Sequence, residues 1–285
     1  MPLVSTQQIV ESVSARGAGI GAFNVITLEH AEAIVAGAEQ AGVPVILQIS
    51  ENAVKFHDGR LAPIAAAVSA VAQLAAVPVS LHLDHVEDAR LLYQAADVGM
   101  SSVMFDASKL EYDANVAATR AAAEWAHERG LYLEAELGEV GGKDGAHAPG
   151  VRTDPVEAAD YVAATGVDAL AVAVGSSHAM TARTAKLDRE LIAELCRAVP
   201  VPLVLHGSSG VADDELRAAV SAGIVKVNIG TILNVAFTGA VRHTLRDPAV
   251  VDPRKYLAPA RAEMTTVVRH LLGVLNGGDT DAQAS

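Results

Sequence analysis

The chain has 285 residues, of which 51% are hydrophobic, and a formal net charge of −13. This length suits one large α/β barrel or two modest domains, and it can bury a full core. Because the acidic residues are spread along the chain, we expect neither nucleic acid nor an anionic membrane as a partner. An anionic substrate would need a locally positive site, which a metal ion can supply.

The cysteine content indicates a reducing compartment. Cys196 is the single cysteine, so an intramolecular disulfide framework is excluded and a cytoplasmic location is expected. We expect Cys196 to be a small buried residue on a helix. The first ten residues lack the basic and apolar regions of a signal peptide, and no run of about 18 apolar residues predicts a membrane span.

Short apolar segments alternate with stretches of helical length along the whole chain. Several helical stretches end at a proline or a glycine, and a β-branched run follows at once. In chain order the predicted strands are residues 20–23, 45–49, 79–83, 102–105, 131–134, 169–172, 203–205 and 225–227. Eight strands, each followed by a helical segment, predict an α/β fold of the (β/α)₈ or TIM-barrel type.

A doubly wound open sheet is the competing architecture, but no Gly-X-Gly-X-X-Gly fingerprint follows the first predicted strand. No compositional break or low-complexity linker divides the chain, so we predict a single TIM-barrel domain over residues 1–285. An additional C-terminal helix is predicted at residues 259–275. The small, polar tail 276–285 is expected to be disordered.

Three histidines follow three different predicted strands. His85 comes after the third strand, His178 after the sixth and His206 after the seventh. Because the carboxyl ends of barrel strands meet at one face, these imidazoles predict a catalytic zinc site with its fourth position open to substrate. Any one of them alone would be an ordinary hydrogen-bonded residue. That structural role is assigned to His82, within the third strand, and solvated roles are expected for His30, His57, His127, His147, His243 and His270.

Carboxylates reach the same predicted face. Asp84 lies beside His85, Asp106 follows the fourth strand, and Glu134 and Glu136 lie near the end of the fifth. A glycine-rich segment of mixed charge, residues 138–145, comes next. It is either a plain surface connection or a mobile active-site lid.

Small residues after the seventh and eighth strands suggest a phosphate site. Residues 207–210 and 228–231 place glycines, hydroxyls and backbone N–H groups before helix starts, where TIM barrels often hold phosphate. Such segments are ordinary turns when they stand alone, so this interpretation depends on the neighbouring histidines.

Together and in this order, these motifs resemble those of the class II ketose-bisphosphate aldolase family. The resemblance covers nearly the whole chain, from residues 21–24 to residues 252–257. Its most specific parts are His82-Leu83-Asp84-His85, Glu134-Ala135-Glu136-Leu137-Gly138 with Gly141-Gly142, His206-Gly207-Ser208-Ser209-Gly210 and Lys226-Val227-Asn228-Ile229.

The resemblance implies roles for individual residues. His85, His178 and His206 would bind the catalytic Zn²⁺, and Asp84 would be the acid/base acting on the C4 hydroxyl of the ketose. Asp106 and Glu136 match carboxylates near the metal, sometimes around a second divalent ion, and a monovalent cation (Na⁺ or K⁺) often lies nearby. The residues matched to substrate and phosphate groups are Asn24, Ser50, Gly207, Ser208, Asn228, Gly230, Thr231 and Arg254.

The implied activity is reversible, zinc-dependent cleavage of fructose or tagatose 1,6-bisphosphate to dihydroxyacetone phosphate and an aldehyde such as glyceraldehyde 3-phosphate. Zinc would polarise the ketone, Asp84 would move the C4 hydroxyl proton, and Asp144 matches the lid acid that protonates carbon. The enzyme would be a lyase of carbohydrate metabolism, glycolysis included, and a homodimer or homotetramer. Arg254 would meet the far phosphate across a subunit interface.

Three departures from the family pattern bear on the substrate. Asp144 replaces a common glutamate, Ala179 replaces a glycine after the zinc histidine, and Asn52 replaces a glycine beside the substrate. They weaken the assignment to fructose bisphosphate and leave open another phosphorylated keto sugar, such as a deoxy-ketogluconate phosphate or a sulfo-sugar phosphate. A zinc hydrolase on a TIM barrel is the alternative from another class, although Asn24 and Ile26 stand where its His-X-His pair would be.

Overall fold

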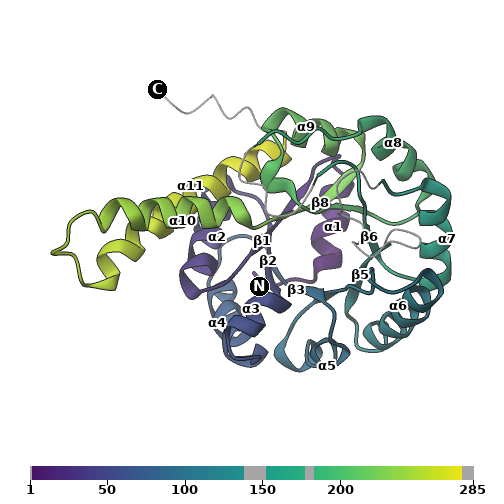
Figure 1. The fold of residues 1–285 in the computed structure, drawn as a ribbon, viewed down its shortest axis with the longest axis horizontal. Helices are drawn as coiled ribbons and strands as arrows, with labels where there is room; N and C mark the ends of the chain where they lie inside the picture. The colour runs from purple at the N-terminus through teal and green to yellow at the C-terminus, as the bar shows by residue number, and fades with distance from the viewer. Residues whose placement is uncertain (1, 138–151, 177–182, 278–285) are drawn as a thin grey trace.

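Eight parallel strands close into one barrel in which each strand pairs with its neighbour in sequence and β8 pairs with β1 (Figure 1). The computed structural model describes residues 2–137, 152–176 and 183–277. The closed order confirms the predicted TIM barrel and excludes the open sheet. The strands are β1 (Ile20–Asn24), β2 (Val45–Ser50), β3 (Val79–Val86), β4 (Ser102–Phe105), β5 (Tyr132–Glu136), β6 (Ala169–Ala171), β7 (Leu203–Leu205) and β8 (Ile224–Ile229).

Helices surround the barrel, and α1 lies across its amino-terminal end, where Thr6 bonds to Ser80 near the start of β3 and to Ser102 at the start of β4 (Figure 1). Every predicted strand is followed by at least one short or long helix among the described residues. The helices are α1 (Thr6–Ser14), α2 (Leu28–Ala41), α3 (Glu51–Phe56), α4 (Leu61–Gln73), α5 (Ala89–Leu92), α6 (Tyr112–His127), α7 (Pro155–Thr165), α8 (Arg189–Ala198), α9 (Asp213–Ala222), α10 (Thr231–Thr244) and α11 (Pro253–Leu275), with 3₁₀ turns η1 (Ala96–Val98) and η2 (Ser208–Gly210).

The strands are buried almost throughout, because helices cover their outer side and side chains fill the barrel. β2 shows the pattern, since its first five residues are buried and Ser50 at its carboxyl end is half-buried.

The ends of the helices are set by local capping residues. Asp154 caps α7 by accepting N–H bonds from Val156 and Glu157, and Gly166 ends it with φ 71°.

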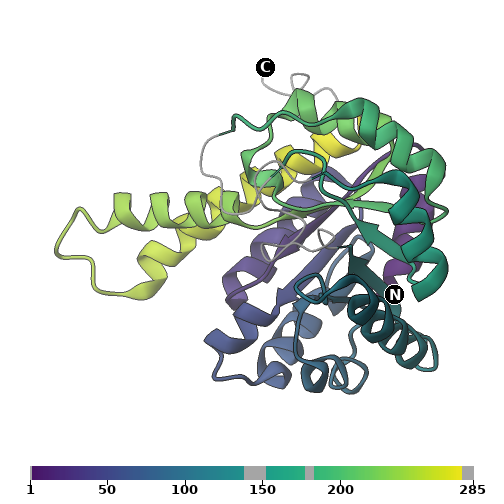
Figure 2. The same cartoon turned by 45° about the vertical axis from the view of Figure 1, so that its right-hand side comes forward.

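The predicted C-terminal helix is present, but its predicted start at Pro259 is wrong, because α11 begins at Pro253. Asp252 caps the helix by accepting the Arg254 N–H at 3.0 Å, and proline is well suited to the first helical position. Pro259 lies inside the helix. α10 and α11 form a hairpin that projects from the barrel (Figures 1 and 2).

The barrel end of α11 packs closely against α2 at Gly37. A Cβ at Gly37 would lie 2.7 Å from Val268 Cβ and 2.9 Å from the carbonyl oxygen of Thr265. We therefore expect Gly37→Ala to lower the free energy of unfolding by about 1–3 kcal/mol, as overpacking does. Chemical denaturation followed by circular dichroism measures this change.

Gly239 in α10 is the matched control, because no heavy atom outside the neighbouring backbone of its own helix lies within 4 Å of the position its Cβ would take. Gly239→Ala should be neutral or stabilising by up to about 1 kcal/mol, since alanine is the better helix former. If Gly37→Ala unfolded at the same denaturant concentration as the unmodified chain, the close packing of α2 on α11 would be wrong.

Two predictions about the burial of side chains are wrong. Cys196 lies on α8 as predicted, but it is exposed rather than buried. His30 is buried and stacks on Phe237 with ring centroids 5.5 Å apart, so its predicted solvated role is wrong. Its place on α2 was visible in the sequence, but the helix that covers it, α10, comes about two hundred residues later.

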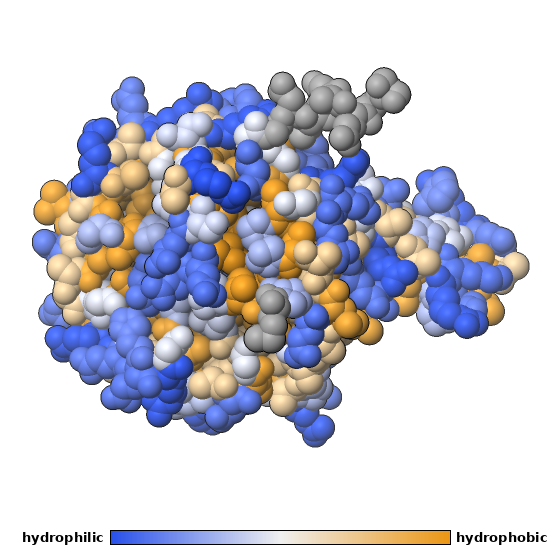
Figure 3. All heavy atoms as spheres, turned by 180° about the vertical axis from the view of Figure 1, so that it is seen from behind, coloured by the Kyte–Doolittle hydropathy of each residue, from blue (hydrophilic) through white to orange (hydrophobic). Residues whose placement is uncertain are grey.

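The surface of the molecule is mixed in hydropathy. Polar residues are spread over the face opposite to that of Figure 1, with apolar residues interspersed (Figure 3). In the part of the chain that the structure covers, no helix combines the length and the apolar character needed to cross a membrane.

Candidate active site

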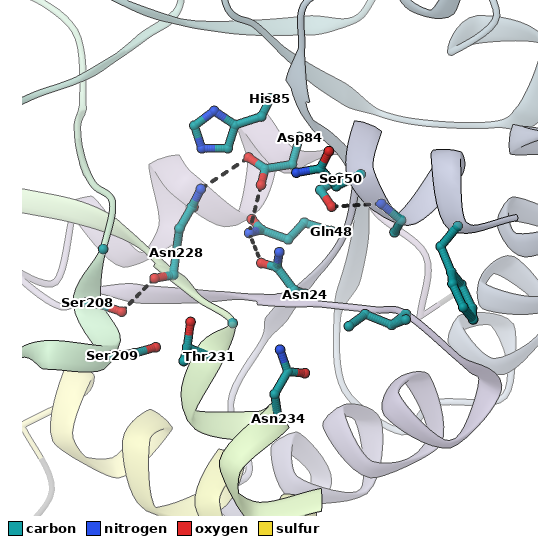
Figure 4. Close-up of a pocket in the computed structure, with 16 residues that line it drawn as sticks. Asn24, Gln48, Ser50, Asp84, His85, Ser208, Ser209, Asn228, Thr231 and Asn234 are labelled. Carbon is teal, nitrogen blue, oxygen red and sulfur yellow. Dashed lines mark hydrogen bonds between the residues drawn. The ribbon is translucent and has the colours of Figure 1, made fainter. Parts of the chain in front are cut away.

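A cavity of about 410 Å³ opens at the carboxyl ends of the strands (Figure 4). Asp84 and His85 lie on its wall, together with every predicted substrate-binding residue except Arg254. Residues far apart in the sequence thus meet at one site. Its lining residues are Asn24, Ile26, Gln48, Ser50, Asn52, Ala53, Phe56, Asp84, His85, Gly207, Ser208, Ser209, Asn228, Gly230, Thr231 and Asn234.

The carboxyl end of β3 is irregular, and this brings two consecutive side chains to the cavity. The pairing of β3 with β4 shifts register between Leu83 and Val86, and His85 has a left-handed backbone with φ 48°. In a regular strand the side chains of Asp84 and His85 would point to opposite faces. A non-glycine residue in this region costs on the order of 1 kcal/mol, and such strain is common at functional sites.

Asp84 is held as a buried carboxylate, 2% exposed. Gln48 Nε2 donates to Asp84 Oδ2 and Asn228 Nδ2 donates to Oδ1, both at 3.2 Å (Figure 4). Burial by itself would raise the pKa of this carboxyl, but the adjacent His85 and the underlying His82 hold the pKa well below its usual range. Asp84 is therefore ionised and can accept a proton.

Two of the three predicted zinc ligands come together. The rings of His85 and His206 lie with centroids 4.7 Å apart. Potential ligand atoms of Asp84, His85 and His206 all lie within 4.8 Å of one another. His178, the third predicted ligand, and Asp144, the predicted lid acid, lie outside the described residues.

A second group shares His85 with the other two predicted metal carboxylates. Ligand atoms of His85, Asp106 and Glu136 lie within 4.8 Å of one another. His85 Nδ1 and Asp106 Oδ2 are 3.0 Å apart, and Glu136 Oε2 is 3.7 Å from His206 Nδ1. The structure thus brings Asp106 and Glu136 to the same place as the two imidazoles.

The charges at this site favour a bound cation. Asp84, Glu134 and Glu136 are buried, and Lys226 is the only buried lysine or arginine within the described ranges. Lys226 Nζ lies 2.8 Å from Glu134 Oε2, so one of these carboxylates already has its cationic partner.

The remaining negative charge changes the pKa of His85. Burial by itself would lower the pKa of His85, but three neighbouring carboxylates, Asp84 foremost, raise it to about 10. The residues thus attract a proton to this position, and a divalent ion held by imidazole and carboxylate would neutralise the same charge. The donor set therefore fits a metal ion.

The opposite wall of the cavity favours an anion. Gly207 has φ 67° before η2, and Gly230 precedes α10, whose N-terminus therefore borders the cavity. A Cβ at Gly230 would lie 3.2 Å from Asn24 Cγ, so the absence of a side chain keeps this wall open. Terminal N–H groups and the helix dipole at such a position favour phosphate.

Hydrogen bonds order this wall. Ser208 Oγ donates to the Asn228 carbonyl at 2.5 Å (Figure 4). The Ile232 N–H donates to Ser209 Oγ at 3.2 Å. The loop after β7 is thereby tied to the end of β8 and to the first turn of α10.

Two polar residues of the cavity were missed from the sequence. Gln48 is fully buried in β2 and bonds to both Asn24 and Asp84. A glutamine within an otherwise apolar strand was an available signal, because a buried amide needs partners. Asn234 lies one turn into α10, and no sequence pattern marked it. His82 has the predicted structural role, since it is fully buried with Nδ1 2.7 Å from Ser102 Oγ.

Arg254 does not line the cavity of its own chain. It lies in the first turn of α11, where its side chain is 90% exposed and pairs with Asp252 at 2.7 Å. A separate hollow between α2 and α11 borders it.

A family model described as fructose-bisphosphate aldolase class-II matches residues 4–280. The chain belongs to the class II fructose-bisphosphate aldolase family. Two relatives are both named fructose-bisphosphate aldolase: that of Staphylococcus aureus is 37% identical over 273 residues, and that of Thermus caldophilus is 38% identical over 295 residues. Each alignment covers 94% of this chain and 96% of the relative.

Solved structures agree with this assignment. The YdjI aldolase from Escherichia coli K12 superposes with a TM-score of 0.84 at 30% identity, covering 99% of this chain and 100% of that chain. As a class II aldolase, the protein is a metal-dependent lyase, and the two residue groups around His85 can hold an ion. Family membership selects aldol chemistry over the zinc-hydrolase alternative.

Proposed function

We propose that this class II aldolase reversibly cleaves fructose or tagatose 1,6-bisphosphate to dihydroxyacetone phosphate and glyceraldehyde 3-phosphate. The observation that carries the proposal is the position of Asp84. Its ionised carboxylate lies between the His85–His206 pair and a wall of the cavity that favours phosphate. The names of the relatives from Staphylococcus aureus and Thermus caldophilus support the same substrate class.

In this proposal the residues around Asp84 control one proton. Asp84 accepts the proton of the C4 hydroxyl as the C3–C4 bond breaks, and it returns that proton during condensation. Gln48 and Asn228 hold the carboxylate in place through their amide donors. The N-terminus of α10 and the loop at Gly207 bind the phosphate of the dihydroxyacetone half. Asp144 is proposed to deliver the proton to carbon.

We propose Zn²⁺ as the catalytic ion, held by His85, His206 and the predicted third ligand His178. Bound there, the ion would act as a Lewis acid that withdraws electron density from the ketone oxygen. Imidazole nitrogens with carboxylates nearby suit zinc. The group of His85, Asp106 and Glu136 supports a position for a second divalent ion, and a monovalent cation is proposed nearby.

A homodimer or homotetramer in the cytoplasm is proposed. Arg254 is exposed and does not line the cavity of its own chain, which supports a role at the far phosphate in a second subunit. Light scattering on the purified protein measures the assembly, and a monomer at enzyme concentrations that support activity would contradict it.

Asn52 lines the cavity, and this supports a second candidate class of substrate. Its side chain takes up space in the pocket, and a different phosphorylated keto sugar, such as a deoxy-ketogluconate phosphate or a sulfo-sugar phosphate, could be the one that fits. The metal site and Asp84 would have the same roles with that substrate.

The test is release of dihydroxyacetone phosphate from fructose and tagatose 1,6-bisphosphates, measured side by side before chelation, after chelation and after zinc is restored. We expect cleavage that is lost with the chelator and returns with zinc, and the preferred sugar assigns the C4 configuration. Zinc-loaded protein that cleaves neither sugar would contradict the proposed substrates, and the two other keto-sugar phosphates would then be assayed.

A further inference from the structure

Three buried side chains behind the barrel form one hydrogen-bonded cluster, and two of them, Asn115 and Tyr161, reach the backbone carbonyl of Glu136. Asn115 and Thr119 lie one turn apart on α6, and Tyr161 lies on the neighbouring helix α7. Asn115 is 1% exposed, and the other two are fully buried. None of them reaches the cavity, so the chemistry described above does not explain them.

Asn115 is the centre of this cluster. Its Nδ2 donates to the Glu136 carbonyl at 3.3 Å, and its Oδ1 accepts from Thr119 Oγ1 at 2.9 Å and from the Tyr161 hydroxyl at 2.8 Å. Because a carbonyl can only accept, the amide NH₂ must face Glu136. The two hydroxyl donors on the other side hold the amide in that orientation.

Glu136 is the last residue of β5, and its partner Ala171 is the last residue of β6. The regular pairing of the two strands therefore stops at the residue whose carboxylate lies in the metal group with His85 and Asp106. The Asn115 amide acts where the pairing ends, and the Tyr161 hydroxyl adds a longer contact to the same carbonyl at 3.4 Å.

Packing alone does not require this cluster. A buried polar group costs free energy unless it is fully hydrogen-bonded, and apolar residues of the same size can fill such a space at similar stability. What the amide supplies and an apolar side chain would not is a direction, because its hydrogen bond fixes the backbone that carries the Glu136 carboxylate.

We propose that Asn115 is a positioning residue for the metal site, which holds the end of β5 so that the Glu136 carboxylate stays beside His85 and His206. Tyr161 orients the Asn115 amide and also contacts the Glu136 carbonyl, whereas Thr119 only adds a second donor to Asn115 Oδ1. The inference rests on the proposed function, since it assumes that a divalent ion binds at these side chains.

The test compares Asn115→Leu with Thr119→Val. Asn115→Leu removes the N–H donor at similar volume, whereas Thr119→Val keeps the bond from Asn115 to Glu136. Zn²⁺ affinity is measured by competition with a chromophoric chelator, and thermal unfolding is measured on the metal-free proteins. We expect Asn115→Leu to bind Zn²⁺ about 10-fold more weakly, the lower end of the range for residues that orient metal ligands, and Thr119→Val to bind it as the unmodified chain does.

Each outcome decides the inference. Equal Zn²⁺ affinity in the unmodified chain and Asn115→Leu would overturn it, and so would an equal loss in both variants, which would indicate a general packing role. If Asn115→Leu does not fold, Tyr161→Phe replaces it, and undiminished Zn²⁺ affinity in that variant would overturn the inference. An unmodified chain that binds no Zn²⁺ would contradict the proposed metal instead.

Discussion

Asp84→Asn is expected to lower kcat for ketose bisphosphate cleavage by about 10²–10⁴-fold, because the amide cannot accept the C4 hydroxyl proton. The substitution keeps the shape of the side chain but leaves it one acceptor oxygen for two donors, Gln48 and Asn228. One of these two buried hydrogen bonds is then lost, so the free energy of unfolding should fall by about 1–3 kcal/mol. Steady-state release of dihydroxyacetone phosphate measures kcat and KM, and thermal unfolding measures the cost.

A second reaction separates the loss of this proton transfer from general damage to the site. Exchange of the reactive carbon-bound proton of dihydroxyacetone phosphate with deuterated water does not involve the C4 hydroxyl. In Asp84→Asn this exchange should persist, and the bound zinc should remain. Cleavage at near-normal rates in the variant would remove Asp84 from its proposed role, whereas loss of both reactions together with zinc would make Asp84 a part of the metal site.

His85→Asn is expected to weaken Zn²⁺ binding by more than about 100-fold, since loss of a group that merely orients a ligand already costs about 10–100-fold. Cleavage should be lost in parallel at limiting zinc. Asparagine is the appropriate replacement because His85 has φ 48°, and asparagine tolerates this backbone region better than most residues. An effect on zinc can then be assigned to the imidazole rather than to the turn.

His57→Asn is the matched control for that experiment. His57 follows α3 and its Nε2 lies 2.8 Å from the Ile26 carbonyl, away from both metal groups. The control should bind Zn²⁺ as the unmodified chain does. Should His85→Asn retain normal zinc affinity and normal kcat, the assignment of His85 as a metal ligand would have to be abandoned.

The local pattern of the chain was sufficient to predict the barrel. Buried β-branched runs alternate with amphipathic segments, and proline or glycine punctuates them, so the strand count and the order of elements follow from short-range chemistry. The first and last residues of a helix are harder to predict from the sequence than its presence. α11 begins at Pro253 because Asp252 caps it, whereas the sequence prediction places its start at Pro259.

The residue types of the site were also visible in the sequence, because carboxyl ends of parallel barrel strands meet at one face. Asp84, His85 and His206 could be placed together on that ground, and all three lie in one group of potential ligands. The gathering of Asn24, Ser50, Asn228 and Thr231 around one cavity agrees with the resemblance that had singled them out. Their roles at substrate remain predictions.

Tertiary structure alone decided which polar side chains are buried and which partners they meet on other helices and strands. His30 is buried because Phe237 of α10, far along the chain, stacks on its ring. Asn115 meets the carbonyl of Glu136 only because α6 and α7 pack together behind β5.

The physical reason is the range of the interactions. Strands and helices are specified by contacts within a few residues, whereas the partner of a buried polar group is specified by the closure of the barrel. The sequence by itself determined which chemical groups reach the active face, and the packing of the helices determined which of them are held in place.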